Sequence, residues 1–255
     1  MKDRDGARKI GLARALSKLG YCSGSRAAVL IRAGRVTLNR KIRRDPETPA
    51  SEKYDRLAVD GKSVEQSNKL YLMMNKPRGV ITTASDEDGR DTVYTVLRGY
   101  SAKSCLRVEP WVGPVGRLDK ASEGLLLLTN DSEWAARIIA PQSHLDKTYH
   151  VQVRGVLEDE SILALLRGVK VTNGEMLQAK RVRRLRSGEK TCWLEIILDE
   201  GRNRQIRRMI EALGGEVLRL IRVAVGPLPL GELAKGALRP LTAKEKRILD
   251  RAMQK

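Results

Sequence analysis

One carboxylate, Asp119, stands out because the residues around it could fix both its position and its charge. It follows the tripeptide GRL and precedes the apolar run GLLLL at 124–128. A buried strand fixes the loop before it, and a neighbouring arginine favours the ionised form of a carboxyl group. An ionised carboxylate held in place can act as a nucleophile or as a general base. The alternative is structural, because an aspartate at the mouth of a strand often only caps a turn.

An arginine-rich segment, EGRNRQIRRM at 200–209, offers a cation for such a carboxylate. In a mostly dry pocket a carboxyl group tends to take up a proton unless a positive charge lies nearby. The spacing predicts a helix over 203–213 with one apolar face, and Arg207 sits on the border of that face. Arg204 and Arg208 project away from it. We therefore expect Arg207 to reach the site, and Arg204 and Arg208 to face solvent or phosphate groups.

Three segments together resemble the motifs of the pseudouridine synthases, in the branch named after the small-subunit ribosomal enzyme RsuA. The run GRLDKASEGLLLLTND at 116–131 is similar to the signature motif of that family. NKPRG at 75–79, followed by a β-branched run, resembles the first motif, and the segment 200–209 resembles the third. The resemblance extends over nearly the whole chain, from about Lys9 to Pro229.

This resemblance implies roles for individual residues. Asp119 matches the catalytic aspartate of the family, and Arg207 matches the basic residue that forms a salt bridge with it. Tyr149 matches the active-site tyrosine, whose ring can stack on an everted uracil and whose hydroxyl can transfer a proton. Leu220 resembles the apolar residue that packs beside the flipped base. Arg117 is the candidate to occupy the gap that the flipped base leaves in the RNA.

The implied reaction breaks the bond between uracil N1 and the ribose, turns the base, and rejoins it through C5. It needs an ionised carboxylate near the sugar, but no oxidant, water or energy source. The sequence leaves open whether Asp119 acts as a nucleophile or as a proton acceptor. We expect no cofactor and no metal site, because the three cysteines and two histidines show no metal-ligand spacing.

A small N-terminal unit is expected to bind RNA. Leucines at helical spacing over 12–19 indicate a first helix, Ser25 can cap a second over 26–33, and a strand follows at 36–39. The run SRAAVLIRAGRVTLN resembles the RNA-binding domain first described in ribosomal protein S4. By that resemblance, these basic residues would contact structured RNA: Arg26, Arg32, Arg35, Arg40 and Lys41. A DNA-binding helix-turn-helix regulator is disfavoured, because the second helix is short and apolar.

The charge balance points to a polyanionic partner. Of 255 residues, 49 are Lys or Arg and 31 are Asp or Glu, which gives a formal net charge of +18. Each phosphate that such a surface neutralises releases counterions, which favours RNA over a merely solvated surface. The sequence shows no signal-peptide core and no membrane-spanning run, so we expect a cytoplasmic protein without a membrane partner.

Helix-like and strand-like segments mix without a strict βαβ alternation, so the predicted fold class is α+β. We expect an RNA-binding domain at 1–64, a linker at 65–69 and a pseudouridine synthase domain at 70–255. The larger domain should contain a mostly antiparallel mixed sheet flanked by helices. Its last segment, at 242–253, is predicted to be a short basic helix to which no function is assigned.

The sequence thus predicts an RNA pseudouridine synthase that modifies ribosomal RNA, free or in a pre-ribosomal particle, and acts as a monomer. Large-subunit (23S) RNA is preferred over small-subunit (16S) RNA on overall similarity alone. The alternative is a ribosome-assembly factor that uses the same scaffold only to bind RNA. Such a factor would not need Asp119, Tyr149 and Arg207 together, and their joint presence favours the enzyme.

Overall fold

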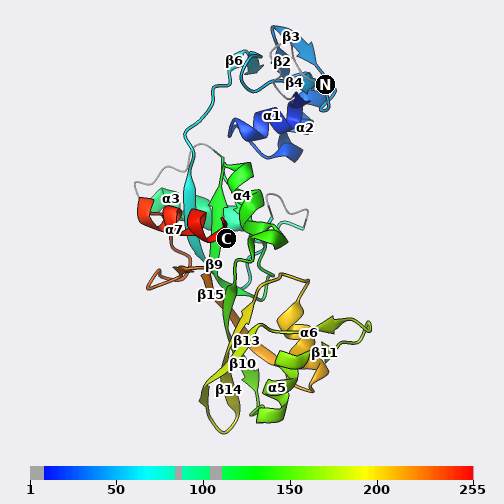
Figure 1. Cartoon of the computed structure of the whole chain (residues 1–255). Helices are drawn as coiled ribbons and strands as arrows, with labels where there is room; N and C mark the ends of the chain where they lie inside the picture. The colour runs from blue at the N-terminus through cyan, green and yellow to red at the C-terminus, as the bar shows by residue number, and fades with distance from the viewer. Residues whose placement is uncertain (1–8, 84–87, 104–110, 255) are drawn as a thin grey trace.

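The computed structural model describes residues 9–83, 88–103 and 111–254 of the chain, with side chains described outside 101–103. The molecule is elongated: a small N-terminal unit lies at one end, and a long sheet runs through the rest (Figure 1). This arrangement matches the predicted division into a small unit and a larger α+β unit.

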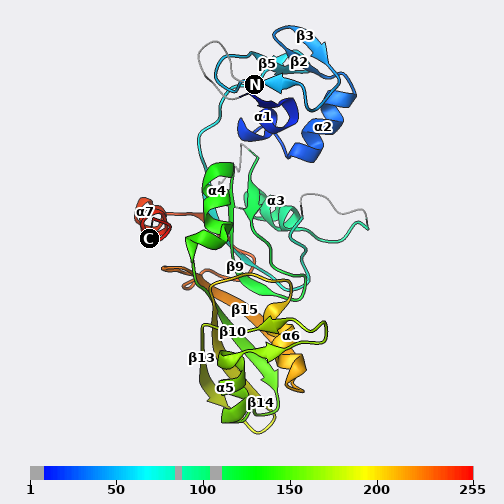
Figure 2. The same ribbon diagram turned by 45° about the vertical axis from the view of Figure 1, so that its right-hand side comes forward.

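The N-terminal unit packs two helices against a small sheet (Figure 2). The helices are α1 (Leu12–Lys18) and α2 (Gly24–Arg32). The sheet has the order β3-β2-β5-β6, with β2 (Val36–Leu38), β3 (Lys41–Arg43), β5 (Leu57–Val59) and β6 (Lys62–Ser63). A separate pair joins β1 (Ile10–Gly11) to β4 (Pro49–Ala50). Leucines spaced along α1 are buried in the core between helices and sheet, as their spacing predicted.

Local details of this unit differ from the sequence prediction at one helix end. The N-cap of α2 is Ser23, not Ser25, and the Ser23 side chain accepts a hydrogen bond from the Arg26 backbone N–H at 3.2 Å. Asp60 and Gly61 form the turn between β5 and β6, with φ of 50° at Asp60 and 78° at Gly61. Positive φ at both turn residues matches the right-handed twist of a tight hairpin.

Within the described residues the main sheet has nine strands, and their pairings are antiparallel except that of β15 with β9. Its main path runs β13-β14-β10-β15-β9-β7-β17, with β8 beside β9 and β16 beside β15. The strands are β7 (Tyr71–Lys76), β8 (Gly113–Val115), β9 (Glu123–Thr129), β10 (Lys147–Arg154), β13 (Arg181–Ser187), β14 (Thr191–Leu198), β15 (Val217–Val225), β16 (Leu228–Pro229) and β17 (Leu238–Pro240). The predicted α+β fold with a mostly antiparallel sheet is confirmed.

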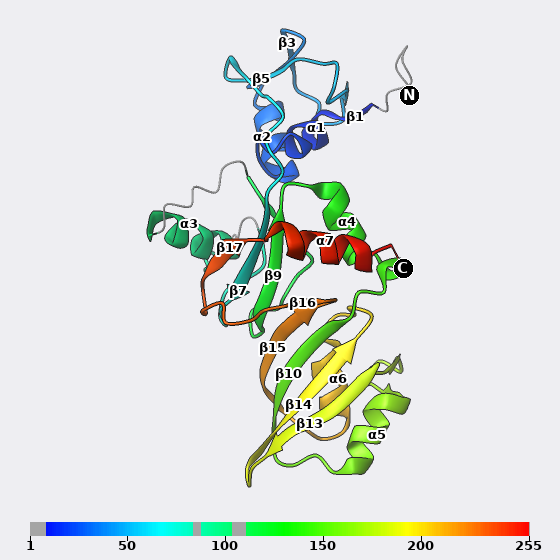
Figure 3. The same ribbon diagram turned by 60° about the vertical axis from the view of Figure 1, so that its left-hand side comes forward.

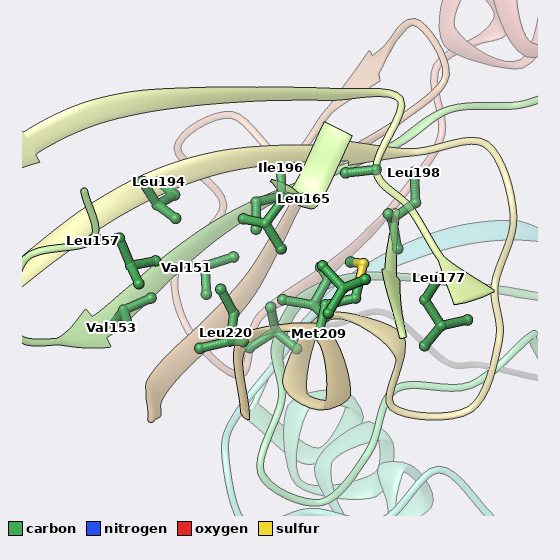
Figure 4. Packing of buried hydrophobic residues seen from close by; sticks show 14 of the residues in the cluster. Val151, Val153, Leu157, Leu165, Leu177, Leu194, Ile196, Leu198, Met209 and Leu220 are labelled. Atoms are coloured by element: carbon green, nitrogen blue, oxygen red, sulfur yellow. The ribbon is translucent and has the colours of Figure 1, made fainter. Parts of the chain in front are cut away.

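Helices cover both faces of the central strands and one face of the outer strands. They are α3 (Val93–Lys103), α4 (Ser132–Ile139), the 3-10 turn η1 (Pro141–Ser143), α5 (Asp159–Arg167), α6 (Gln205–Ala212) and α7 (Ala243–Ala252). A short hairpin of β11 (Val169–Lys170) and β12 (Met176–Leu177) lies near α6. Helices α5 and α6 lie on one face of the outer strands (Figure 3). Their apolar side chains interlock with those of β10, β14 and β15 in a single core (Figure 4).

Strand β9 is the centre of the sheet and sets the position of the loop before it. Every residue of β9 is buried, as its unbroken apolar sequence predicted. Gly124 has φ of 103°, and a Cβ atom there would lie 2.3 Å from the carbonyl oxygen of Arg222. Only glycine therefore lets β9 approach β15 this closely. This approach brings the loop at 116–122 next to β15.

Other segments of the larger unit follow the prediction less closely. The β-branched run at 80–83 forms no strand; only Ile81 makes an isolated bridge, to Thr92. Between β6 and β7 the chain is irregular, where the linker was predicted. This segment is nevertheless tied down, because Ser67 Oγ donates to the Leu19 carbonyl at 2.7 Å. Within the described ranges, no helix combines the length and apolar character needed to cross a bilayer.

Candidate active site

The loop that carries Asp119 is held by a buried lysine, Lys76. Its ammonium group donates hydrogen bonds to three carbonyl oxygens: Ser122 at 2.8 Å, Asp119 at 3.1 Å and Pro77 at 3.1 Å. The Lys76 side chain is completely buried. Burial lowers its pKa to about 8, and the negative charges of Asp119 and Glu123 oppose that change. Lys76 belongs to the NKPRG segment, but the sequence analysis gave it no role.

A second set of contacts fixes the same loop from the other side. Thr82 Oγ1 donates to the Leu118 carbonyl at 2.7 Å, and the Gly79 N–H donates to the Lys120 carbonyl at 2.8 Å. The segment that resembles the first family motif, together with the residues just after it, therefore donates several hydrogen bonds to the signature loop. The Asp119 carboxylate is presented from a loop whose backbone is held at several points, which suits a group that must meet a substrate atom in one geometry.

Asp119 opens into a cleft of about 360 Å³ between the loop, the sheet and the start of α6. Five of the residues predicted for the site line this cleft: Arg117, Asp119, Tyr149, Arg204 and Leu220. Tyr149 and Leu220 lie on the neighbouring strands β10 and β15, where Leu220 is the register partner of Val151. Tyr149 is half-buried and also packs against two apolar cores, so it combines a packing role with a place in the cleft.

Arg207 turns inward as predicted, but its contacts differ from the predicted salt bridge. Its guanidinium donates to the carbonyl oxygens of Ala121 at 3.1 Å and Val217 at 3.2 Å. Among the described residues it makes no ion pair with Asp119 within 4.0 Å. Burial and the nearby Arg204 lower the pKa of Arg207, whereas attraction by Asp119 opposes this. Arg207 thus acts on the loop chiefly through a backbone bond two residues beyond Asp119.

The two outward arginines of this segment have different surroundings. Arg204 is exposed, has φ of 49° and is the N-cap residue of α6, which begins two residues later than predicted. Arg208 donates to Glu175 at 2.7 Å and to Asn173 at 2.8 Å. The predicted solvent or phosphate contact fits Arg204. For Arg208 it stays a prediction, because that guanidinium is ion-paired with Glu175 and would first have to leave it.

Comparisons with known proteins agree with this geometry. A family model described as RNA pseudouridylate synthase matches residues 70–212, and a model described as S4 domain matches residues 10–54. The chain belongs to the RNA pseudouridylate synthase family. The match covers the signature loop, Tyr149 and α6, and the second match covers both N-terminal helices.

Relatives of the synthase span nearly its full length. Ribosomal large subunit pseudouridine synthase B of Bacillus subtilis is 35% identical over 92% of this chain and 93% of its own. An RNA pseudouridine synthase of Aquifex aeolicus is 34% identical over 93% of this chain and 92% of its own. A crystal structure described as pseudouridylate synthase has a TM-score of 0.62 at 27% identity, covering 94% of this chain and 99% of that one.

The cleft of the synthase is also lined by three cations to which the sequence assigned no role: Lys147 on β10, Arg222 on β15 and Arg202, which is ion-paired with Glu175 and Glu200. Arg222 is only 7% exposed, and its Nε donates to the Leu125 carbonyl at 2.7 Å. Burial lowers the pKa of Lys147, and repulsion by Arg222 adds to this effect. One sequence signal was available, because an arginine within the apolar run of β15 interrupts a strand that is otherwise suited to a core.

The basic residues predicted for the N-terminal unit are all exposed: Arg26, Arg32, Arg35, Arg40 and Lys41. Arg35 is ion-paired with Asp60, through Nε at 2.9 Å and through a second, shorter bond. Arg40 has φ of 65° in the turn between β2 and β3, which places it and Lys41 at the tip of the hairpin. Four of the predicted side chains are therefore available to RNA, while Arg35 would first have to leave Asp60.

The N-terminal unit of the synthase is joined to the larger unit by contacts as well as by the chain. Lys18 Nζ bridges Glu52 at 3.0 Å and Glu133, in the first turn of α4, at 3.1 Å. The Trp111 N–H donates to the Gly20 carbonyl at 3.1 Å. These contacts join α1 and the turn after it to the larger unit, so both units can contact one RNA molecule at a defined separation.

Proposed function

We propose that this synthase isomerises a uridine of large-subunit ribosomal RNA to pseudouridine, with Asp119 as the catalytic group. The observation that carries this proposal is the cleft in which Asp119, Tyr149 and Leu220 come together from three separate segments. An everted base would lie between the phenol ring and the leucine side chain. The carboxylate would then face the sugar, where the bond to be broken lies.

In the proposed reaction, the bond between C1′ and uracil N1 breaks, and its electron pair leaves with the base. Asp119 either attacks C1′, forming an ester bond that breaks when C5 bonds to C1′, or accepts a proton from the sugar and later returns it; both routes remain open. The detached base turns, C5 bonds to C1′, N1 takes up a proton, and the proton at C5 is lost. In this proposal Tyr149 holds the base by stacking, and its hydroxyl transfers that proton. No external oxidant, reductant or cofactor enters this balance.

Two cations near Asp119, Lys76 and Arg207, serve the proposed chemistry by fixing the position of its loop. The negative charge of Asp119 acts on both of them. Each also donates a hydrogen bond to a backbone carbonyl of the loop, Lys76 to Asp119 and Arg207 to Ala121. Arg117 is exposed at the rim of the cleft, where it can replace the everted base in the RNA stack.

Large-subunit RNA is proposed as the substrate because several relatives are called ribosomal large subunit pseudouridine synthase B, including that of Bacillus subtilis. The exposed cations of the N-terminal unit suit a folded RNA, free or in a pre-ribosomal particle. We further propose that the protein acts as a monomer in the cytoplasm. Small-subunit RNA is the competing substrate.

Release of tritium from uridine labelled at C5 tests the proposed activity. Purified protein is incubated separately with labelled large-subunit and small-subunit RNA, and Asp119→Ala serves as the paired variant. We expect release from large-subunit RNA by the wild type and none by Asp119→Ala. Release only from small-subunit RNA would show that small-subunit RNA, and not large-subunit RNA, is the substrate. Binding without release from either RNA would support an assembly factor and contradict the enzyme.

A further inference from the structure

The cleft contains a corner that is positively charged and has no assigned function. Arg222 and Lys147 both line it, from the neighbouring strands β15 and β10. Arg222 is the register partner of Tyr149, and Lys147 lies two residues before Tyr149 on the same strand. Alternate residues of a strand share a face, so Lys147 and Tyr149 point to the same side of the sheet. The two cations therefore flank the predicted base pocket.

No carboxylate of the described residues lies within 4.0 Å of either cation. Asp146, the nearest acidic residue in the sequence, is ion-paired with Lys180 at 2.8 Å. Asp199 offers Lys147 only its backbone carbonyl, at 3.4 Å. The charges of Asp146 and Asp199 therefore act on Lys147 without forming an ion pair with it.

The Arg222 guanidinium is the clearest case of a charged group in this corner without an anionic partner. The side chain is more than nine-tenths buried, and Nε is satisfied by the Leu125 carbonyl. In the described part of the chain its two terminal nitrogens have no hydrogen-bond partner. Burial and the charge of Arg222 together lower the pKa of Lys147. Two like charges in a partly dry site destabilise a protein unless an anion joins them.

We propose that Arg222 and Lys147 bind a phosphate group next to the target uridine after that nucleotide has turned into the cleft. This proposal rests on the proposed function, because only a synthase brings a nucleotide to this site. With uracil between Tyr149 and Leu220, the adjoining phosphates lie one sugar away, within reach of the corner. A phosphate there offsets the charges of the buried Arg222 and the half-buried Lys147 at once. Unlike the exposed arginines, this pair would contact only an everted nucleotide.

The first test measures how kcat/KM on ribosomal RNA depends on salt, with Lys147→Gln as the variant and Lys244→Gln as the matched control. Lys244 carries the same charge but is exposed on α7, away from the cleft. We expect Lys147→Gln to reduce kcat/KM roughly tenfold to a hundredfold at low salt. Its logarithmic salt slope should be shallower by about 0.7–0.9, the value for one phosphate. Lys147→Arg should restore both quantities, and an unchanged slope in Lys147→Gln would overturn the proposal.

The second test needs no turnover, so it separates failure of this proposal from failure of the proposed function. The Tm of the RNA-free protein is measured with uridine, 5′-UMP or 3′-UMP. A ligand that binds the folded state raises Tm by mass action. We expect one of the monophosphates to raise Tm more than uridine does, which identifies the phosphate that binds. That difference should vanish in Lys147→Gln and in Arg222→Gln, and equal effects of all three ligands on the wild type would contradict the proposal.

The Tm of Lys147→Gln without ligand gives a further check. If the lysine serves the RNA and not the fold, removing its charge relieves repulsion by Arg222, and Tm stays the same or rises. A decrease of several degrees would mean that Lys147 is a structural group, and the phosphate site would be rejected. A wild type that is inactive on RNA but still distinguishes UMP from uridine would instead count against the proposed function alone.

Discussion

The ammonium group of Lys76 lies 3.1 Å from the carbonyl oxygen of Asp119 and holds the loop through this hydrogen bond. The same group also holds Ser122, three residues further along the loop, at 2.8 Å. A buried cation bound to backbone oxygens restricts the loop without using the Asp119 carboxylate, which stays available to a substrate.

Lys76→Met should therefore damage both stability and turnover. The substitution leaves buried carbonyl groups without donors, and we expect the free energy of unfolding to fall by about 2–4 kcal/mol. Urea denaturation measures this change, with Lys120→Met as the control in the same loop, because Lys120 is exposed. The rate of tritium release by Lys76→Met should fall by more than the increase in the fraction of unfolded protein can account for. Wild-type stability in Lys76→Met would show that the loop does not depend on this lysine.

Arg207 and Arg204 should affect different kinetic quantities, although only two residues separate them. Arg207→Ala removes the donor to the Ala121 carbonyl. It should lower kcat roughly a hundredfold while RNA affinity changes little. Arg204→Ala should mainly weaken RNA binding and make its salt slope shallower by about 0.7–0.9. Single-turnover rates and filter binding distinguish the two effects, and the reverse assignment would mean that α6 is oriented wrongly in this account.

The hydroxyl of Tyr149 should matter for chemistry more than for binding. Tyr149→Phe keeps the ring proposed to stack on the base but removes the hydroxyl proposed to transfer a proton. We expect kcat to fall roughly a hundredfold and KM to stay within about threefold, whereas Tyr149→Ala should raise KM as well. Full activity in Tyr149→Phe would leave the residue with a stacking role only.

The C-terminal helix α7, for which no function was predicted, should have a pH-dependent stabilising role. Glu245 completes a capping box with Thr242 and forms a bidentate pair with Arg239 at 2.6 and 2.8 Å. These contacts, led by Arg239, lower the pKa of Glu245 from 4.5 to about 2. Because the folded-state pKa is lower than the unfolded one, the stabilisation is present above pH 4.5 and is lost as pH falls toward 2.

Glu245→Gln should accordingly be less stable than the wild type at pH 7, by about 1 kcal/mol, the usual scale for a lost cap. The difference in the free energy of unfolding should shrink as pH is lowered from 5 to 3. Denaturant titrations at matched pH values measure it. A difference that is constant over this range would assign the effect to helix propensity and not to the Glu245 charge.

Sequence patterns predicted those features that depend on residues close together in the chain. The apolar run of β9 predicted a buried strand, because a sheet interior covered on both faces accepts only such a run. The border position of Arg207 on its helix predicted an inward side chain. The family resemblance placed Asp119, Tyr149 and Leu220 in one site, and all three line the cleft.

The features that were missed depend on contacts between distant segments. In the sequence, nothing distinguishes Lys76 from an exposed lysine. Its role becomes visible only in the fold, where its ammonium group donates to the carbonyl oxygens of Asp119 and Ser122. Arg208 faces away from the core of α6, as predicted, but Glu175 on a separate hairpin reaches it there. Helix periodicity gives the direction of a side chain and not the partner that the fold supplies. For the same reason the paired charges at Lys147 and Arg222 could not be recognised from either strand alone.

Asp119→Asn gives the most direct test, because it removes the negative charge but keeps the shape of the side chain. Tritium release from C5-labelled large-subunit RNA is measured under single-turnover conditions, together with the Kd for the same RNA. We expect release to fall below detection while Kd stays within about threefold of the wild type, since most affinity comes from phosphate contacts. Release at the wild-type rate by Asp119→Asn would contradict it.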